Sequence, residues 1–142
     1  MTSTPRRPRT FAVWLLFVLL LVQAAGAVAG GIALVAGPQG EVLQMPVSML
    51  EGSPFDSYLV PGLVLLLVLG VLPLAAAVGL WLRRPWAWWA AGVVGCGLLI
   101  WIVVQVSIVD YHWLQPAYGA MGALILLACL PHSVRRYAGV SR

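Results

Sequence analysis

Charged side chains are confined to short segments of this chain, and four long stretches between them carry none: 11–36, 58–82, 86–109 and 115–134. Hydrophobic residues make up 62% of the sequence. Charged residues make up 8%, whereas soluble domains have about 25%. A chain with so few charged residues cannot form the polar, water-exposed surface of a soluble protein. The sequence therefore predicts an integral membrane protein.

The lengths of these stretches predict how often the chain crosses the membrane. A helix needs about 20 apolar residues to cross a hydrocarbon core of about 30 Å. The first three stretches hold 26, 25 and 24 residues and satisfy this requirement. The fourth is weaker, because only 117–130 is strictly apolar, a length that also suits a re-entrant segment. We expect it to cross, because Arg135 and Arg136 follow it as a stop.

The predicted fold class is all-α: a polytopic four-transmembrane-helix bundle that forms one membrane domain over residues 1–142. The only long connection is an outer loop, 37–57, which is rich in proline and glycine. We expect it to be irregular, with one turn around 47–51. The connections between the second and third and between the third and fourth spans are short. Each of these pairs should therefore be antiparallel neighbours.

The distribution of charge predicts the orientation. All eight basic residues are arginines, in three clusters: Arg6, Arg7 and Arg9; Arg83 and Arg84; Arg135, Arg136 and Arg142. With four crossings, all three clusters fall on one side, which the positive-inside rule makes cytoplasmic. Both termini should then be cytoplasmic in a multi-pass protein of the bacterial cell membrane. The acids Glu41, Glu51, Asp56 and Asp110 fall on the outer side.

A cleaved signal peptide is the alternative for the first span. Three arginines, an apolar run over 11–22 and the small residues Ala27-Val28-Ala29 fit a secretory signal, and cleavage would leave three spans. We expect the helix to be retained, because the apolar run continues to Ala36, past the usual core of about 7–15 residues.

The residues that could carry chemistry do not form a reactive set. Cys96 and Cys129 lie in separate apolar stretches without a Cys-x-x-Cys spacing. His112 and His132 should lie at opposite membrane faces, so they cannot ligate one haem. No carboxylate, histidine or lysine is expected at membrane depth, where proton-coupled transporters need one. We therefore expect no enzyme activity, no cofactor and no metal.

A polar vestibule is expected at the outer ends of the second to fourth helices. Counted from the outer border, Gln105 lies about 6 Å deep and Trp101 one turn below it. The candidate vestibule consists of Trp101, Gln105, Asp110, His112, Tyr58 and Tyr118. The simpler interpretation is that these groups only anchor loops and pack helix ends, since such residues are common near interfaces.

Gln23 and Pro73 are predicted to form one structural unit near the bilayer midplane. Proline has no N–H to donate to the carbonyl four residues earlier, here that of Leu69. An unpaired carbonyl in hydrocarbon costs several kcal/mol, so a donor is expected. Leu69 and Gln23 lie about 16 and 20 Å deep, within reach of a glutamine side chain. The alternative is that Gln23 faces a cavity or another protomer.

Three strings carry a family resemblance: 53–62 (SPFDSYLVPG), 101–105 (WIVVQ) and 114–118 (LQPAY). In these, the chain resembles a group of small uncharacterised bacterial integral membrane proteins with four spans, over about 53–130. The resemblance implies the four-span architecture and implies no activity.

The expected function is a structural, accessory or assembly role in a bacterial cytoplasmic membrane. The alternative is a small-molecule or lipid-binding protein, or a permease, that uses the outward-facing vestibule near Gln105 and Trp101. The expected partners are the lipid bilayer and either a membrane protein or a second copy of the chain. Nucleic acid is not expected, because the arginines flank apolar spans and do not cover one water-exposed face.

Overall fold

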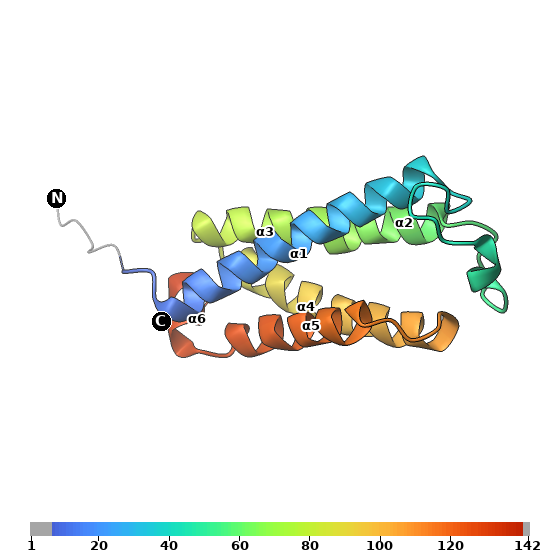
Figure 1. Ribbon diagram of the computed structural model, residues 1–142. Coiled ribbons are helices and arrows are strands. Elements are labelled where there is room, and N and C mark those ends of the chain that lie inside the picture. Colours follow the sequence, from blue (N-terminus) through green and yellow to red (C-terminus); the bar gives the residue numbers. More distant parts are fainter. Residues whose placement is uncertain (1–6, 141–142) are drawn as a thin grey trace.

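The computed structural model describes residues 7–140, and all regular structure in this range is helical (Figure 1). The elements are α1 (Phe11–Ala36), η1 (Val47–Leu50), α2 (Leu59–Leu66), η2 (Leu67–Val71), α3 (Leu72–Trp81), α4 (Pro85–Ile108), α5 (Leu114–Cys129) and α6 (His132–Tyr137). The elements α2, η2 and α3 follow one another without a break and form one helix. Three helices, 11–36, 59–81 and 85–108, are long and apolar enough to cross a membrane.

The helices run lengthwise and give the molecule two ends (Figure 1). At the arginine end lie the start of α1, the turn between α3 and α4, and α6. At the loop end lie 37–58 and the turn between α4 and α5. As predicted, α3 packs on α4 and α4 packs on α5, while α1 lies against α2, α3 and α5. The described arginines all belong to the arginine end, and the four acids belong to the loop end.

The largest buried core lies toward the arginine end. Leu16 and Leu20 of α1 pack there with Leu80, Val94 and Ile125 of three other helices. The interface of α3 and α4 is made from small side chains that are fully buried: Ala76, Ala77, Ala87 and Ala91. Small residues let helix backbones approach closely in lipid, where water supplies no drive for association.

The predicted unit of Gln23 and Pro73 is present. Pro73 is the second residue of α3, which follows a π-helical turn in which the N–H of Leu72 bonds to the carbonyl of Leu67, five residues earlier. The Gln23 Nε2 atom donates a hydrogen bond of 3.2 Å to the carbonyl of Leu69. Gln23 and Leu69 are each only 1% exposed. The side-chain amide therefore replaces the donor that proline lacks.

The prediction of one continuous helix over 115–134 was wrong. The helix ends at Cys129, and Pro131 takes an extended conformation (φ −57°, ψ 136°) before α6 begins at His132. Proline cannot supply the N–H that would continue the helix. The 16 residues of α5 span about 24 Å, which is short of a hydrocarbon core of about 30 Å. The first helix has the predicted bounds, and the second and third differ from prediction by one residue at each end.

Candidate functional site

The outer loop folds back over the loop end of the bundle. The Tyr58 N–H donates to the Pro38 carbonyl at 2.8 Å, and its hydroxyl donates to the Pro46 carbonyl at 3.0 Å. Tyr58 is buried with Leu34 and Leu50, the last residue of η1, in a small apolar cluster. The expected turn around 47–51 is the 3₁₀ helix η1. Tyr58 thus anchors both ends of the loop.

A cavity of about 90 Å³, the loop cavity, lies between this loop, α2 and α4. Its lining residues come mainly from the loop and one face of α4: Leu34, Met45, Leu50, Phe55, Tyr58, Pro61, Trp101, Val104, Gln105, Ile108 and Val109. Every one of these side chains is uncharged. The loop cavity is therefore a mainly apolar space, with the polar groups of Tyr58, Trp101 and Gln105 in its lining.

A second cavity of about 220 Å³, the bundle cavity, lies among α1, α2, α4 and α5. It is lined by Gln23, Gly26, Ala27, Gly30, Leu34, Leu43, Met45, Leu65, Leu98, Trp101, Ile102, Gln105, Leu114 and Tyr118. Trp101 and Gln105 line both cavities, so they lie between the two. The bundle cavity extends from Leu114, at the start of α5, to Gln23 in the middle of α1.

Gln23 gives the bundle cavity a polar inner end. Its amide nitrogen bonds to Leu69, whereas its Oε1 atom is buried and has no hydrogen-bond partner among residues 7–140. An unsatisfied buried acceptor costs about 1–3 kcal/mol. A molecule that places a donor at this end of the cavity would remove that cost.

Tyr118 enters the bundle cavity because Gly26 leaves room for it. A side chain at position 26 would place its Cβ atom 2.8 Å from the Tyr118 hydroxyl oxygen. Trp101, Gln105 and Tyr118 are all half-buried, so each presents part of its surface to the cavity. One tyrosine, one tryptophan and two glutamines thus line an otherwise apolar bundle cavity.

Asp110 and His112, which were predicted to belong to the vestibule, are not among the residues that line either cavity. Both are exposed in the turn between α4 and α5. Gln115 Nε2 donates to the Asp110 carbonyl at 3.3 Å, and the His112 N–H donates to Gln115 Oε1 at 3.2 Å. Val109 takes an extended conformation (φ −110°, ψ 141°), so α4 ends before Asp110 and His112.

The structure brings Trp101, Gln105, Tyr58 and Tyr118 around the two cavities. Sequence reasoning gave a cavity-facing Gln23 only as the alternative to its structural role, whereas the residue both bonds to Leu69 and lines the bundle cavity. It missed Gln115, which is 3% exposed and organises the turn. Both residues carry a polar amide within an uncharged stretch, and this pattern could have identified them in the sequence.

No protein family, curated protein or solved structure matches this chain. The resemblance to small four-span bacterial proteins stays a prediction. Within residues 7–140, no group of three or more His, Cys, Asp or Glu side chains could hold a metal ion. Both cysteines are free. Functional interpretation therefore depends on the two cavities and on the surface of the bundle.

Proposed function

We propose that this chain is a four-span protein of the bacterial cytoplasmic membrane, with its arginine end in the cytoplasm. The three long apolar helices and the separation of arginines from acids support this topology. The side-by-side course of α4 and α5 in Figure 1 supports a fourth crossing. Because α5 is short, the residues that flank it, such as Trp113 and Leu130, would then complete the membrane crossing.

Within this topology, the protein binds a small neutral molecule that carries a hydrogen-bond donor. The observation that supports this function is the bundle cavity, which extends from the loop end to the unpaired Oε1 of Gln23. No charged side chain lines the cavity, which favours a neutral ligand. Its volume of about 220 Å³ is below the usual range of about 300–1,000 Å³, which favours a small one.

The proposal is tested by placing a large side chain at Gln105, a residue that lines both cavities. Gln105→Trp places a large ring where both cavities meet, whereas Val106→Trp adds the same ring at the next position of α4, which is 56% exposed. Each variant is purified in mild detergent and measured by native mass spectrometry. We expect a bound small molecule on the wild type and on Val106→Trp, and its loss from Gln105→Trp. Equal occupancy in all three proteins, or none in any, would contradict the proposal.

An accessory or assembly role is the second candidate. A surface groove of about 590 Å³ runs along α4 and α5, past Gly92, Cys96 and Leu126. A side chain at Gly92 would meet no atom within 4 Å, so this face of α4 is open. Small residues on an exposed face allow another helix to approach closely. A stoichiometric protein partner that is lost in Gly92→Leu, while the cavity ligand is retained, would favour this role.

A further inference from the structure

The arginine end carries several positive charges and no acidic side chain. Arg7 and Arg9 precede α1, and Arg83 lies in the turn between α3 and α4. Glu41, Glu51, Asp56 and Asp110, the only acids of the chain, all belong to the loop end. These guanidinium groups therefore have no carboxylate side chain to pair with.

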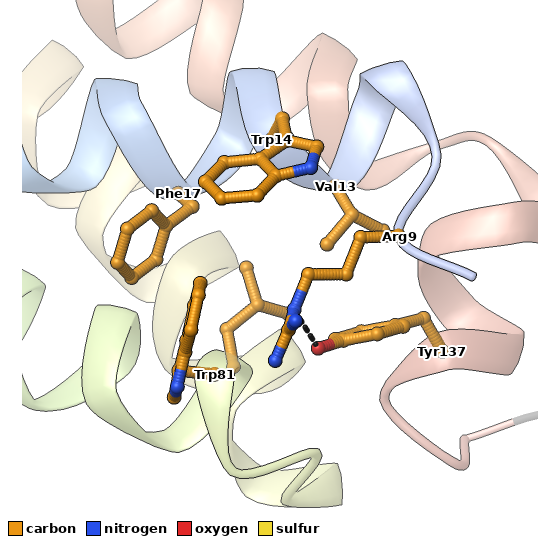
Figure 2. Close-up of a pocket in the computed structure, with 7 residues that line it drawn as sticks. Arg9, Val13, Trp14, Phe17, Trp81 and Tyr137 are labelled. Atoms are coloured by element: carbon orange, nitrogen blue, oxygen red, sulfur yellow. Dashed lines mark hydrogen bonds between the residues drawn. The ribbon is translucent and has the colours of Figure 1, made fainter. Parts of the chain in front are cut away.

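Arg9 is held in a fixed position despite lacking an ion pair. Figure 2 shows its guanidinium group between the rings of Trp81 and Tyr137. The guanidinium carbon lies 3.8 Å from the centre of the Trp81 ring, and Nε donates to the Tyr137 hydroxyl at 2.9 Å. Trp14 and Phe17 pack on Trp81 at centroid distances of 5.7 and 5.2 Å. The hydrogen bond to Tyr137 uses Nε and leaves the two terminal nitrogens of the Arg9 guanidinium group out of this contact.

Arg83 is held by the same tyrosine. Its backbone is left-handed (φ 59°), which is uncommon for a residue with a side chain. Its guanidinium lies 4.5 Å from the centre of the Tyr137 ring, and Nη2 donates to the Arg7 carbonyl at 2.7 Å. Tyr137 is only 4% exposed, so it forms a rigid support for both arginines.

An open hollow of about 560 Å³, here named the arginine hollow, lies beside these groups. It is lined by Arg7, Pro8, Arg9, Trp81, Leu82 and Arg83. Arg9 also lines a small space of about 10 Å³ among the packed rings of Trp14, Phe17, Trp81 and Tyr137. Of these two spaces, only the arginine hollow has room for a ligand.

We propose that the arginine hollow binds the phosphate group of an anionic phospholipid in the inner leaflet. Guanidinium groups match phosphate oxygens in geometry and charge. Tryptophan at the end of a span, such as Trp81, lies at headgroup level. The assignment to the inner leaflet rests on the orientation proposed above, and the binding chemistry is independent of the cavity ligand.

The organisation of the arginines goes beyond what orientation requires. The positive-inside rule depends on the number of basic residues near the span ends and not on their geometry. Here two guanidinium groups from segments far apart in the sequence share one buried tyrosine, and a third arginine accepts a bond through its carbonyl. Fixing both groups in advance lowers the entropy lost when an anion binds.

The experiment compares charge removal inside and outside the hollow. The full chain is placed in nanodiscs of phosphatidylcholine with increasing phosphatidylglycerol, and retained lipid is measured by native mass spectrometry. The test variant is Arg9→Gln with Arg83→Gln. The control is Arg84→Gln with Arg136→Gln, which removes the same charge from positions at the same end that do not line the hollow. We expect the control to retain phosphatidylglycerol like the wild type and the test variant to lose about tenfold in affinity.

Two further measurements keep the outcome decisive. Tyr137→Phe keeps every charge and the ring but removes the hydroxyl that orients Arg9, and it should weaken phosphatidylglycerol retention severalfold even if the double variant fails to fold. Inorganic phosphate, added to nanodiscs of phosphatidylcholine alone, should not raise the unfolding temperature. Equal lipid loss in test and control variants, unchanged retention in Tyr137→Phe, or full protection by inorganic phosphate would each overturn the proposal.

Discussion

At the scale of single residues, Gln23 has two roles on its two polar atoms. Its nitrogen compensates the Leu69 carbonyl, which Pro73 leaves without a backbone donor. Its oxygen is buried and unpaired among the described residues, and the residue lines the bundle cavity. The hydrogen bond to Leu69 stabilises the fold, whereas the unpaired oxygen lowers stability until a ligand supplies a hydrogen-bond donor. The two roles can be separated by removing the proline.

Gln23→Leu is expected to lower the unfolding temperature modestly, because interhelical hydrogen bonds in membranes average about 0.6 kcal/mol. In a Pro73→Ala background the same change should have less effect or a stabilising one, since the introduced alanine offers its own N–H to Leu69 and the unpaired oxygen is removed. Tryptophan fluorescence during thermal unfolding in detergent measures both. Equal losses in the two backgrounds would show that the bond to Leu69 is not what Gln23 contributes.

At the scale of helices, α1 and α2 approach so closely that glycine is required on both. A Cβ atom at Gly31 would lie 2.8 Å from the Leu66 backbone, and one at Gly62 would lie 2.7 Å from the Leu34 Cβ. Helices in lipid associate through such backbone proximity. Backbone atoms cannot move aside as a flexible side chain can, so these contacts set the spacing of the pair.

Gly31→Ala should therefore destabilise the protein, by about 1–3 kcal/mol as for other overpacked sites. Gly92→Ala on α4 is the matched control, because nothing lies within 4 Å of its Cβ position. Both changes gain up to about 1 kcal/mol of helix propensity, so their difference isolates the packing cost. The measurement is thermal unfolding in the same detergent. Similar unfolding temperatures for the two variants would mean that α1 can shift away from α2 at little cost.

At the scale of the whole molecule, charge divides the bundle into two ends. Arginines gather where α1 begins, α3 meets α4, and α6 lies, while acids occupy the loop and the turn at the other end. A bundle that spans the bilayer with this division has one energetically favoured orientation. The two ends also differ in the spaces they enclose. The uncharged loop cavity and bundle cavity lie toward the loop end, and the arginine hollow lies at the arginine end.

Labelling should place the two ends on opposite sides of the membrane. In a chain with Cys96 and Cys129 replaced by alanine, a membrane-impermeant maleimide applied to intact cells should modify Ser48→Cys in the outer loop and not Ser133→Cys in α6. The intact mass should include α1. Labelling of Ser133→Cys would contradict the orientation, and a mature chain beginning at Gly30 would indicate a cleaved signal.

Features that depend on local chemistry could be predicted from the amino-acid order alone. The three long helices follow from runs of apolar residues, and the division of charge is visible residue by residue. The bond from Gln23 to Leu69 followed from the missing N–H of Pro73 and from a depth count along two helices. The end of α5 before Pro131 follows from the same rule, which the prediction for 115–134 did not apply.

Which residues share a site depends on how the helices pack against one another, and could not be predicted from the sequence. Asp110 and His112 follow α4 directly in the sequence, yet both are exposed and neither lines the cavities that Trp101 and Gln105 line. Arg9, Arg83 and Tyr137 come from three distant segments, and no local pattern predicts that one ring supports both cations. The physical reason is that depth along a helix follows from residue count. The direction of a side chain around the helix matters only once the neighbouring helices are in place.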